Sequence, residues 1–182
     1  MKFTPLTLGG AYLIDLEKIE DDRGFFARFS CEKEFTTYGL ITRWLQMNTS
    51  LTNQQGSIRG LHFQRPPKAE AKLVRCLRGS VWDVIVDLRR NSNTFGKWHE
   101  TELSENNRSM VYIPEGFAHG FQTLMPDVEM LYFHSDFHSP EHEGGLRYDD
   151  PALGIEWPLS VSDISKRDQE HPELSELKPV EL

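Results

Sequence analysis

The sequence predicts an all-β domain in which short strands form a sandwich or a barrel. Runs of strand-forming residues follow one another along most of the chain, and Gly or Pro residues separate them. Helical patterns are few and short. Many short strands with this punctuation bury their apolar faces best as two packed sheets or as a barrel. The length of 182 residues fits one domain with a substantial core.

Four segments carry the clearest strand patterns. They are AYLIDLEKI at residues 11–19, KLVRCLRGSVWDVIVDLRR at 72–90, SMVYIP at 109–114 and VEMLYFHSDF at 128–137. The segment at 72–90 is long enough for two strands, and Gly79 within it predicts a turn between them.

We expect a few short helices at the periphery of the sheets. CEKEFTTYG at residues 31–39 follows Ser30, a candidate N-cap, and reaches a stop signal at Gly39. A second short helix is expected within SDISKRDQE at residues 162–170.

The whole chain is interpreted as one domain, residues 1–182. Its β core spans about residues 10–150, and the segment 151–182 is rich in proline with little periodicity. We expect this segment to be irregular and to pack on the core, with Trp157 as its anchor.

Composition and charge exclude several functions. The net charge of −8 disfavours general binding to nucleic acid or to an anionic membrane surface. The start, MKFTPLTLGG, lacks the apolar core of a signal peptide, and no run is long enough to span a membrane. Cys31 and Cys76 do not form a CxxC pair, so we expect reduced thiols in a cytoplasmic protein.

A histidine interrupts the strand-like run SIRGLHFQ at residues 57–64. It lies six positions after a glycine and is followed by Gln64, while Lys72 lies seven positions before another glycine. Further on, PEGFAHGF contains His119. These spacings resemble the two motifs of the cupin superfamily, which are double-sheet jelly rolls. Metal-binding cupins hold two histidines, a carboxylate and a third histidine where this chain has His62, Gln64, Lys72 and His119.

Two of these four positions argue against a metal. Gln64 is a poor ligand, and the ammonium group of Lys72 repels a cation. We therefore expect a cupin without a metal, in which Lys72 stabilises an anion formed during a reaction. Plainer interpretations are that Lys72 extends to water and that His62 is a structural group. Arg59 adds a further positive group near these residues, and a barrel interior rarely holds so many without a ligand.

Seven motifs resemble those of the dTDP-4-dehydrorhamnose 3,5-epimerase family. The resemblance runs from residue 13 to residue 168, and because any single motif is weak, their number and order identify the family. They are DDRGFF at 21–26, QMNTS at 46–50, RGLHFQ at 59–64, KLVRCLRGSVWDVIVDLR at 72–89, IPEGFAHGF at 113–121, DDPALGIEWP at 149–158 and SKRD at 165–168.

The resemblance implies a cofactor-independent epimerase acting on a nucleoside-diphosphate 4-keto-6-deoxyhexose. The ketone at C4 acidifies the protons on C3 and C5, so a base can remove one and an acid can return it to the opposite face. The resemblance assigns the base to His62, its dyad partner to Asp168, the group at the enolate oxygen to Lys72 and the proton donor to Tyr132. A base with a pKa near neutrality suits this reaction. From sequence alone, the plainer interpretations are that Asp168 is an ordinary acidic residue on a charged segment and that Tyr132 packs in the barrel.

The resemblance also assigns the substrate contacts. Guanidinium groups suit phosphate oxygens, and surface salt bridges are the plainer interpretation of the arginines. The family's diphosphate positions match Arg23, Arg59 and His119, its base and ribose segment matches Gln46 and Asn48, and a further binding position matches Glu143. In addition, Asp83 shares its strand parity with Val81 and Ile85, which predicts a buried carboxylate near the cationic groups.

Three positions depart from the family pattern. Arg28 replaces an acidic residue in the nucleotide-binding region, so cytosine is an alternative to thymine as the base. Phe137 and His138 replace two tyrosines near the sugar, which brings the C5 step into question and makes a C3-only epimerase an alternative. Arg167 replaces a lysine next to the dyad aspartate, which keeps the charge and changes the geometry.

Three other functions are alternatives to epimerisation. The departures at Arg28 and His138 are also compatible with a non-catalytic nucleotide-sugar binder. A sugar 3,4-ketoisomerase resembles the chain less, because the segment with Asp168 fits the epimerases better. A metal-dependent cupin oxygenase is disfavoured by Gln64 and Lys72.

The family resemblance implies a two-fold homodimer and a place in deoxysugar biosynthesis. Exchange of the N-terminal strand would let Arg23 complete the site of the neighbouring subunit. The product would feed a surface polysaccharide such as O-antigen or another glycosylated product. We expect no cofactor, no nucleic acid and no membrane among the partners.

Overall fold

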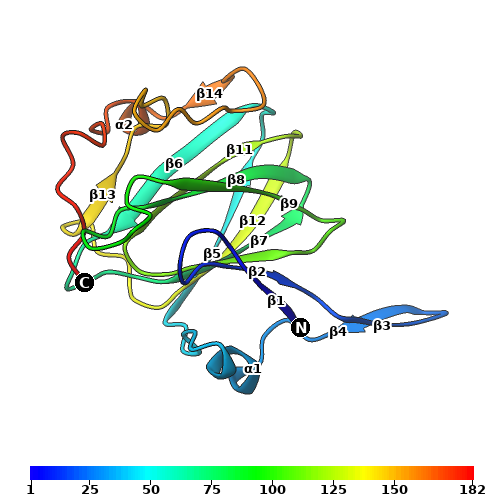
Figure 1. Cartoon of the computed structure of the whole chain (residues 1–182). Coiled ribbons are helices and arrows are strands. Elements are labelled where there is room, and N and C mark those ends of the chain that lie inside the picture. Colours follow the sequence, from blue (N-terminus) through cyan, green and yellow to red (C-terminus); the bar gives the residue numbers. More distant parts are fainter.

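The computed structural model describes residues 1–182 and consists of two facing β-sheets, as the all-β prediction requires. The sheets pack as a sandwich with antiparallel neighbours (Figure 1). Strands far apart in sequence lie side by side in both, which is the pattern of a jelly roll. The first sheet has the order β1 (Lys2–Pro5), β2 (Tyr12–Asp15), β10 (Met110–Ile113), β7 (Lys72–Arg78), β12 (Val128–His134) and β5 (Gln46–Thr52).

The second sheet carries the C-terminal segment at one edge. Its order is β13 (Glu143–Gly145), β6 (Ser57–Gln64), β11 (Phe117–Thr123), β8 (Ser80–Asp87) and β9 (Trp98–Ser104). The short β14 (Asp163–Ile164) pairs with β6 in the parallel direction. The remaining elements are the hairpin strands β3 (Lys18–Asp21) and β4 (Gly24–Ala27) and the helices α1 (Glu32–Thr37) and α2 (Lys166–Gln169).

Three apolar clusters hold these layers in place. Alternate side chains of β7, β8, β11 and β12 fill the space between the sheets, because successive residues of a strand point to opposite faces. A second cluster joins the outer face of the second sheet to the C-terminal segment, and a third lies under α1 on the outer face of the first sheet. Burial of this apolar surface is the main stabilising contribution. Typical members are Val74, Ile85 and Phe121 in the first, Leu61, Leu153 and Val180 in the second, and Phe35, Leu73 and Met110 in the third.

The predicted turns, helix ends and strand bounds were partly right. Gly79 separates β7 from β8 with a positive φ of 79°, and Gly39 ends α1 with a φ of 68°. The N-cap of α1 is Cys31, not Ser30, and its side chain makes no capping hydrogen bond. The run at 11–19 forms two strands, β2 and part of β3, in place of one.

The C-terminal segment packs on the second sheet, as expected. Trp157 lies against the apolar cluster there and donates its indole N–H to the Tyr148 carbonyl at 2.9 Å. The segment at 162–170 contains both β14 and α2, and Ser165 caps α2 by accepting from the Asp168 amide. No helix is both long and apolar enough to cross a membrane.

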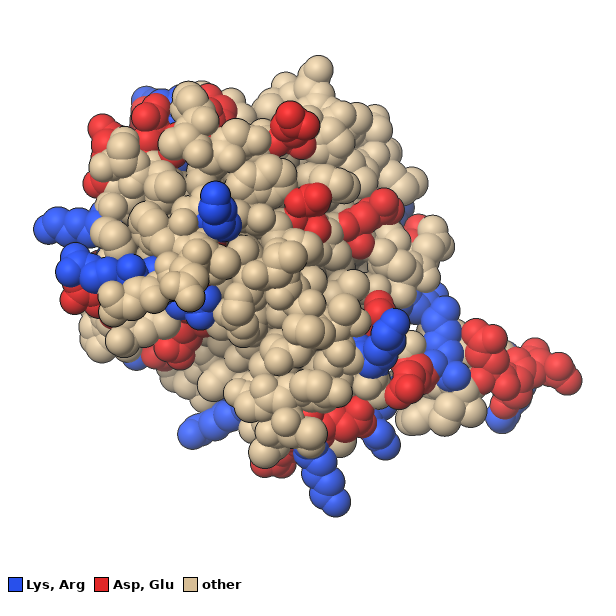
Figure 2. Space-filling view, in the orientation of Figure 1, with Lys and Arg blue, Asp and Glu red and all other residues tan.

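The β3–β4 hairpin projects away from the sandwich (Figure 1). Ile19 and Phe26 on it are 71% and 73% exposed. Figure 2 shows acidic side chains gathered at its tip. Large exposed apolar side chains at such a density mark an interaction surface.

Candidate active site

A cavity of about 530 Å³ opens between the two sheets and is lined almost entirely by polar side chains. Strands β5, β7 and β12 form one wall, β6 and β11 form the other, and β13 and α2 complete its rim. Ten of the predicted site residues line it: Asn48, Arg59, His62, Lys72, His119, Tyr132, His138, Glu143, Arg167 and Asp168.

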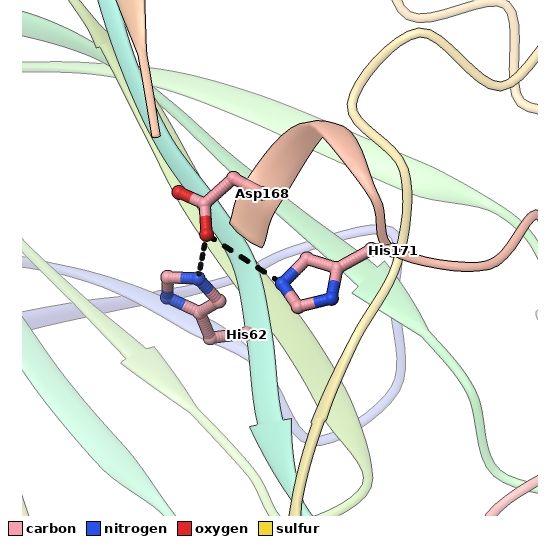
Figure 3. A group of neighbouring side chains, drawn as sticks. All are labelled: His62, Asp168 and His171. Atoms are coloured by element: carbon pink, nitrogen blue, oxygen red, sulfur yellow. Dashed lines mark hydrogen bonds and ion pairs between the residues drawn. The ribbon is translucent and has the colours of Figure 1, made fainter. Parts of the chain in front are cut away.

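The cavity contains a histidine–aspartate pair built from distant segments. His62 on β6 and Asp168 on α2 lie with Nε2 and Oδ1 2.8 Å apart (Figure 3). The second carboxylate oxygen, Oδ2, accepts the Gly60 amide at 3.1 Å. Because Ser165 caps the start of α2, the carboxylate is fixed in both position and orientation.

This pair determines where His62 carries its proton. A carboxylate only accepts hydrogen bonds, so Nε2 of His62 is the protonated nitrogen and Nδ1 keeps its lone pair. Burial lowers the pKa of His62 below 6.5, and the positive charges of Lys72 and Arg167 act in the same direction against the pull of Asp168. The imidazole is therefore neutral at pH 7, as a base must be.

Asp168 stays ionised in spite of its burial. Burial raises its pKa, but hydrogen bonds from His171, His62 and the Gly60 amide together outweigh that effect and hold the pKa well below its ordinary range. The carboxylate can therefore stabilise the imidazolium that forms when His62 takes up a proton.

Two glycines make this arrangement possible. Gly60 has a φ of +117°, and a Cβ on it would lie 2.7 Å from the backbone of Gly120 and of His119. A Cβ on Gly120 would lie equally close to the Arg59 carbonyl. Because both residues lack a Cβ atom, β6 and β11 can lie close together at this point, and the Gly60 N–H donates to Asp168.

A second histidine–aspartate pair lies directly beside the first. His119 on β11 faces His62 across the β6–β11 ladder, and its Nε2 lies 2.7 Å from Oδ2 of Asp83 on β8. Asp83 is almost fully buried among apolar side chains of its own strand face. The structure thus buries the Asp83 carboxylate next to His119, and its supporting role in the site stays a prediction.

Tyr132 approaches the cavity from the opposite sheet. Its hydroxyl lies 2.9 Å from that of Ser50 on β5. Burial raises the pKa of Tyr132 far above 10, so the phenol keeps its proton at any physiological pH. Tyr132 thus offers a proton from the wall that faces His62.

Lys72 lies on the same wall as Tyr132 and belongs to a row of charged and polar side chains in contact with one another. Its Nζ lies 3.4 Å from the His62 carbonyl and 3.3 Å from Glu70 Oε1. Glu70 in turn accepts from His134 Nδ1 at 2.9 Å, and His134 Nε2 lies 3.4 Å from the Asn48 amide. Burial raises the pKa of Glu70, and His134 and Lys72 more than reverse this, so Glu70 is ionised. The ammonium of Lys72 thus lies between the Glu70 carboxylate and the backbone of β6, the strand that carries His62.

The rim of the cavity carries the remaining cations. Arg167 pairs with Glu143 at 2.9 Å, and its guanidinium lies 3.3 Å from His62 Nε2. His138 Nε2 lies 3.6 Å from Glu143. Arg59 donates to the Thr52 hydroxyl at 2.8 Å and to the Leu51 carbonyl. Gln46 lies just outside, where it accepts the His138 amide and donates to Asn48.

Two residues that were predicted to bind the substrate, Arg23 and Arg28, do not line the cavity of a single chain. Arg23 is at the turn of the β3–β4 hairpin and pairs with Asp21 in solvent. Arg28 follows β4 and pairs with Glu34 of α1 at 2.6 Å. One chain does not bring either residue to His62.

Gln64 has a structural role. Its amide donates to the Lys68 and Phe137 carbonyls, and its carbonyl oxygen accepts the Ser139 amide at 2.6 Å. It therefore anchors the loop that carries His138, and all its polar groups are occupied. That Gln64 is no metal ligand stays a prediction from its chemistry.

Sequence reasoning missed four residues of the site: Ser50, Glu70, His134 and His171. His134 has the parity of Tyr132 on β12, and Ser50 has that of Asn48 on β5, so strand periodicity was an available signal. Glu70 lies in a loop before β7, and His171 follows α2, and no periodic pattern places either one.

Comparison with known proteins agrees with this geometry. The family model described as dTDP-4-dehydrorhamnose 3,5-epimerase matches residues 5–176. The chain belongs to this family. Its structure is accordingly a cupin-type jelly roll, and the family is one of isomerases.

Three relatives illustrate the range of the family. The dTDP-4-dehydrorhamnose 3,5-epimerase of Sinorhizobium fredii is 44% identical over 97% of this chain and 91% of its own length. The dTDP-4-dehydrorhamnose 3-epimerase of Streptomyces niveus is 37% identical over 100% and 88%. The 3,5-epimerase of Bacillus anthracis, solved with TDP and PPi bound, superposes with a TM-score of 0.91 at 38% identity, covering 94% of this chain and 98% of that one.

Proposed function

We propose that this chain epimerises dTDP-4-dehydro-6-deoxyglucose at C3 and C5. One observation carries the proposal: a neutral histidine base and a protonated tyrosine line opposite walls of one polar cavity. Inversion at carbon needs a proton acceptor on one face of the sugar and a proton donor on the other.

Each inversion starts at His62. The C4 ketone acidifies the neighbouring C–H bond, and the lone pair on Nδ1 takes the proton while the bonding electrons move onto the ketone oxygen. Asp168 stabilises the resulting imidazolium through Nε2–H. His62 thus gains one proton and the sugar becomes an enolate.

Lys72 and Tyr132 complete the inversion. The ammonium of Lys72 is placed to stabilise the enolate oxygen, and Glu70 limits where that ammonium can move. Tyr132 then gives its proton to the opposite face of the carbon, and the enolate electrons form the new C–H bond. Proton exchange with water restores Tyr132 and His62 for the second carbon.

The cations at the rim suit the diphosphate. Arg59 and Arg167 present guanidinium groups, and His119 presents an imidazole fixed by Asp83. Thymine is the proposed base, because the Bacillus anthracis relative holds TDP. Deoxysugar biosynthesis for a surface polysaccharide such as O-antigen, in the cytoplasm, is the proposed context.

A homodimer is proposed to complete the site. The β3–β4 hairpin exposes Ile19 and Phe26 and carries Arg23 at its turn, away from its own cavity. Docked on a second copy, it would bury these side chains and bring Arg23 toward that copy's diphosphate site.

Subunit mixing tests the dimer. We expect R23A and H62N each to be nearly inactive alone. A mixed dimer has one site with both wild-type residues, so co-refolded subunits should regain up to about a quarter of wild-type activity on statistical mixing. Mixtures no more active than the single variants would mean that Arg23 acts within its own chain or not at all.

Proton NMR in D₂O tests the activity. With dTDP- and CDP-4-keto-6-deoxyglucose offered separately, we expect loss of both the C3 and C5 signals with the dTDP sugar. Faster exchange with the CDP sugar would show that Arg28 has changed base preference. Exchange with neither, while calorimetry detects binding, would favour a non-catalytic nucleotide-sugar binder.

A second candidate is inversion at C3 alone. His138 stands at the cavity rim where the family pattern has tyrosine, and the Streptomyces niveus relative is named a 3-epimerase. In the same NMR experiment, loss of the C3 signal with an unchanged C5 signal would favour it.

A further inference from the structure

His171 lies beside the His62–Asp168 pair in a site shaped to hold its ring. A Cβ on Gly145, the residue opposite His62 on β13, would overlap the imidazole. The Arg147 amide donates to the Pro172 carbonyl at 3.0 Å and ties the residues around His171 to the end of β13. The ring is mostly buried, so it has little freedom to leave this position.

The ring contacts the pair through one nitrogen. His171 Nε2 lies 3.5 Å from Oδ1 of Asp168, the same oxygen that binds His62 Nε2 (Figure 3). The imidazoles of His62 and His171 meet edge to face with centroids 5.6 Å apart. His171 Nε2 is shielded from solvent and has no closer hydrogen-bond partner. A buried nitrogen facing a carboxylate is favourable only when it carries the proton.

The donor atoms of His62, Asp168 and His171 lie within 4.8 Å of one another, which is also a spacing that could hold a metal ion. The guanidinium of Arg167 opposes it. One of its nitrogens is 3.3 Å from His62 Nε2 and another is 3.8 Å from Asp168 Oδ1. A fixed positive charge at this distance repels a divalent cation, so the geometry favours two imidazoles that face one shared carboxylate.

We propose that His171 is a positioning residue for the base, sharing the Asp168 carboxylate with His62 and thereby limiting how strongly that carboxylate holds a proton on His62. The inference rests on the proposed function of His62. His171 has no place among the residues lining the cavity, so it acts through Asp168 and not on the sugar.

The sign of the effect follows from the charges around His62. Asp168 and Arg167 face it from α2, and Lys72 faces it from β7. Glu143 on β13 is paired with Arg167. Without the N–H of residue 171, the charge of Asp168 would act on His62 with less competition. The pKa of His62 would rise, and more of the base would be protonated near neutral pH.

Two substitutions separate positioning from packing. H171F keeps a flat ring of similar size and removes the N–H, whereas H171Q places an N–H near the position of Nε2. We expect H171F to raise the pKa of His62 by about 0.5 unit, the equivalent of part of one hydrogen bond. H171Q should lie closer to the wild type. H99F, at a histidine on β9 outside the cavity, is the matched control.

The measurement is an NMR titration of His62 in the free protein, followed by the pH profile of kcat/KM. The titration needs no substrate, so it gives a result even if the proposed reaction is wrong. Where the reaction occurs, the acid limb of the profile should move to higher pH by the same amount in H171F. An unchanged or lower pKa in folded H171F, or equal shifts in H171F and H171Q, would overturn the proposal.

Discussion

Two histidine–aspartate pairs lie side by side on β6 and β11, with nearly the same bond length and different surroundings. The His62–Asp168 distance is 2.8 Å and the His119–Asp83 distance is 2.7 Å. The His62 side chain is 28% exposed in the cavity, whereas the His119 side chain is 5% exposed. The same chemistry therefore occurs once with the imidazole open to the cavity and once with the imidazole almost buried in the cavity wall.

The source of the carboxylate explains the difference. Asp83 belongs to β8, the direct neighbour of β11, so its pair forms with the sheet itself. Asp168 belongs to α2 and reaches His62 only when the C-terminal segment docks. A pair formed within the sheet becomes a rigid, buried element of the fold, while the pair completed by the C-terminal segment leaves one face of the imidazole available. This comparison assigns proton transfer to the His62 pair, and it assigns stability and the placement of His119 in the cavity wall to the other.

The largest expected effect is on the accessible pair. H62N removes the base and keeps a polar side chain of similar width, and we expect kcat/KM to fall by about 10²- to 10⁴-fold, the typical contribution of general base catalysis. Exchange of the C3 proton in D₂O measures it, with thermal unfolding as the check that the fold is intact. A loss below tenfold would remove His62 from the reaction.

Breaking the sealed pair should mainly change stability. D83N leaves His119 beside an amide in a buried site, and we expect the free energy of unfolding to fall by about 3 kcal/mol. Urea unfolding followed by fluorescence measures it. If stability is unchanged and only substrate affinity falls, Asp83 acts on the ligand through His119 and has no structural role.

The matched change in the accessible pair should do the reverse. D168N keeps the shape of the side chain but removes the charge that stabilises the imidazolium, so we expect kcat to fall by about 100-fold. The free energy of unfolding should fall by less than in D83N, because Asp168 belongs to the C-terminal segment and not to a strand of the sheet. Equal losses of stability in D168N and D83N would contradict the contrast between the two pairs.

The smallest expected effect is in the pH dependence. Burial and nearby cations lower the pKa of His62, so the acid limb of kcat/KM should have its midpoint below 6.5. The activity depends on the neutral imidazole and is lost as pH falls through that midpoint. A midpoint above 6.5 would mean that the attraction of Asp168 prevails over burial.

The two pairs also mark what the sequence could predict. Asp83 followed from strand parity alone, because Val81 and Ile85 share its face. His62 and Lys72 followed from motif spacing. Asp168 lies 106 positions from His62, and only resemblance to a family linked the two. Strand periodicity describes one strand at a time and contains no information on where a distant segment docks.

The same limit of local patterns explains why sequence reasoning missed some residues and placed others elsewhere. Glu70 and His171 lie outside regular strands, where local patterns give no direction to a side chain. Arg23 matched the family motif and Arg28 departed from it, yet the hairpin carries Arg23 into solvent, and Arg28 meets Glu34. In the proposed dimer, binding by Arg23 would depend on a second copy, which one chain does not specify.

The docking of α2 on β6 has a consequence for biosynthesis of the protein. Translation proceeds from the N-terminus, so every strand of the two sheets is synthesised before Asp168. The strands are thus complete in the sequence before the residue that pairs with the imidazole of His62. Truncation by a stop codon before residue 168 would remove Asp168 together with Leu177 and Val180, so one lesion would take away both the histidine–aspartate pair and part of the apolar cluster on the second sheet.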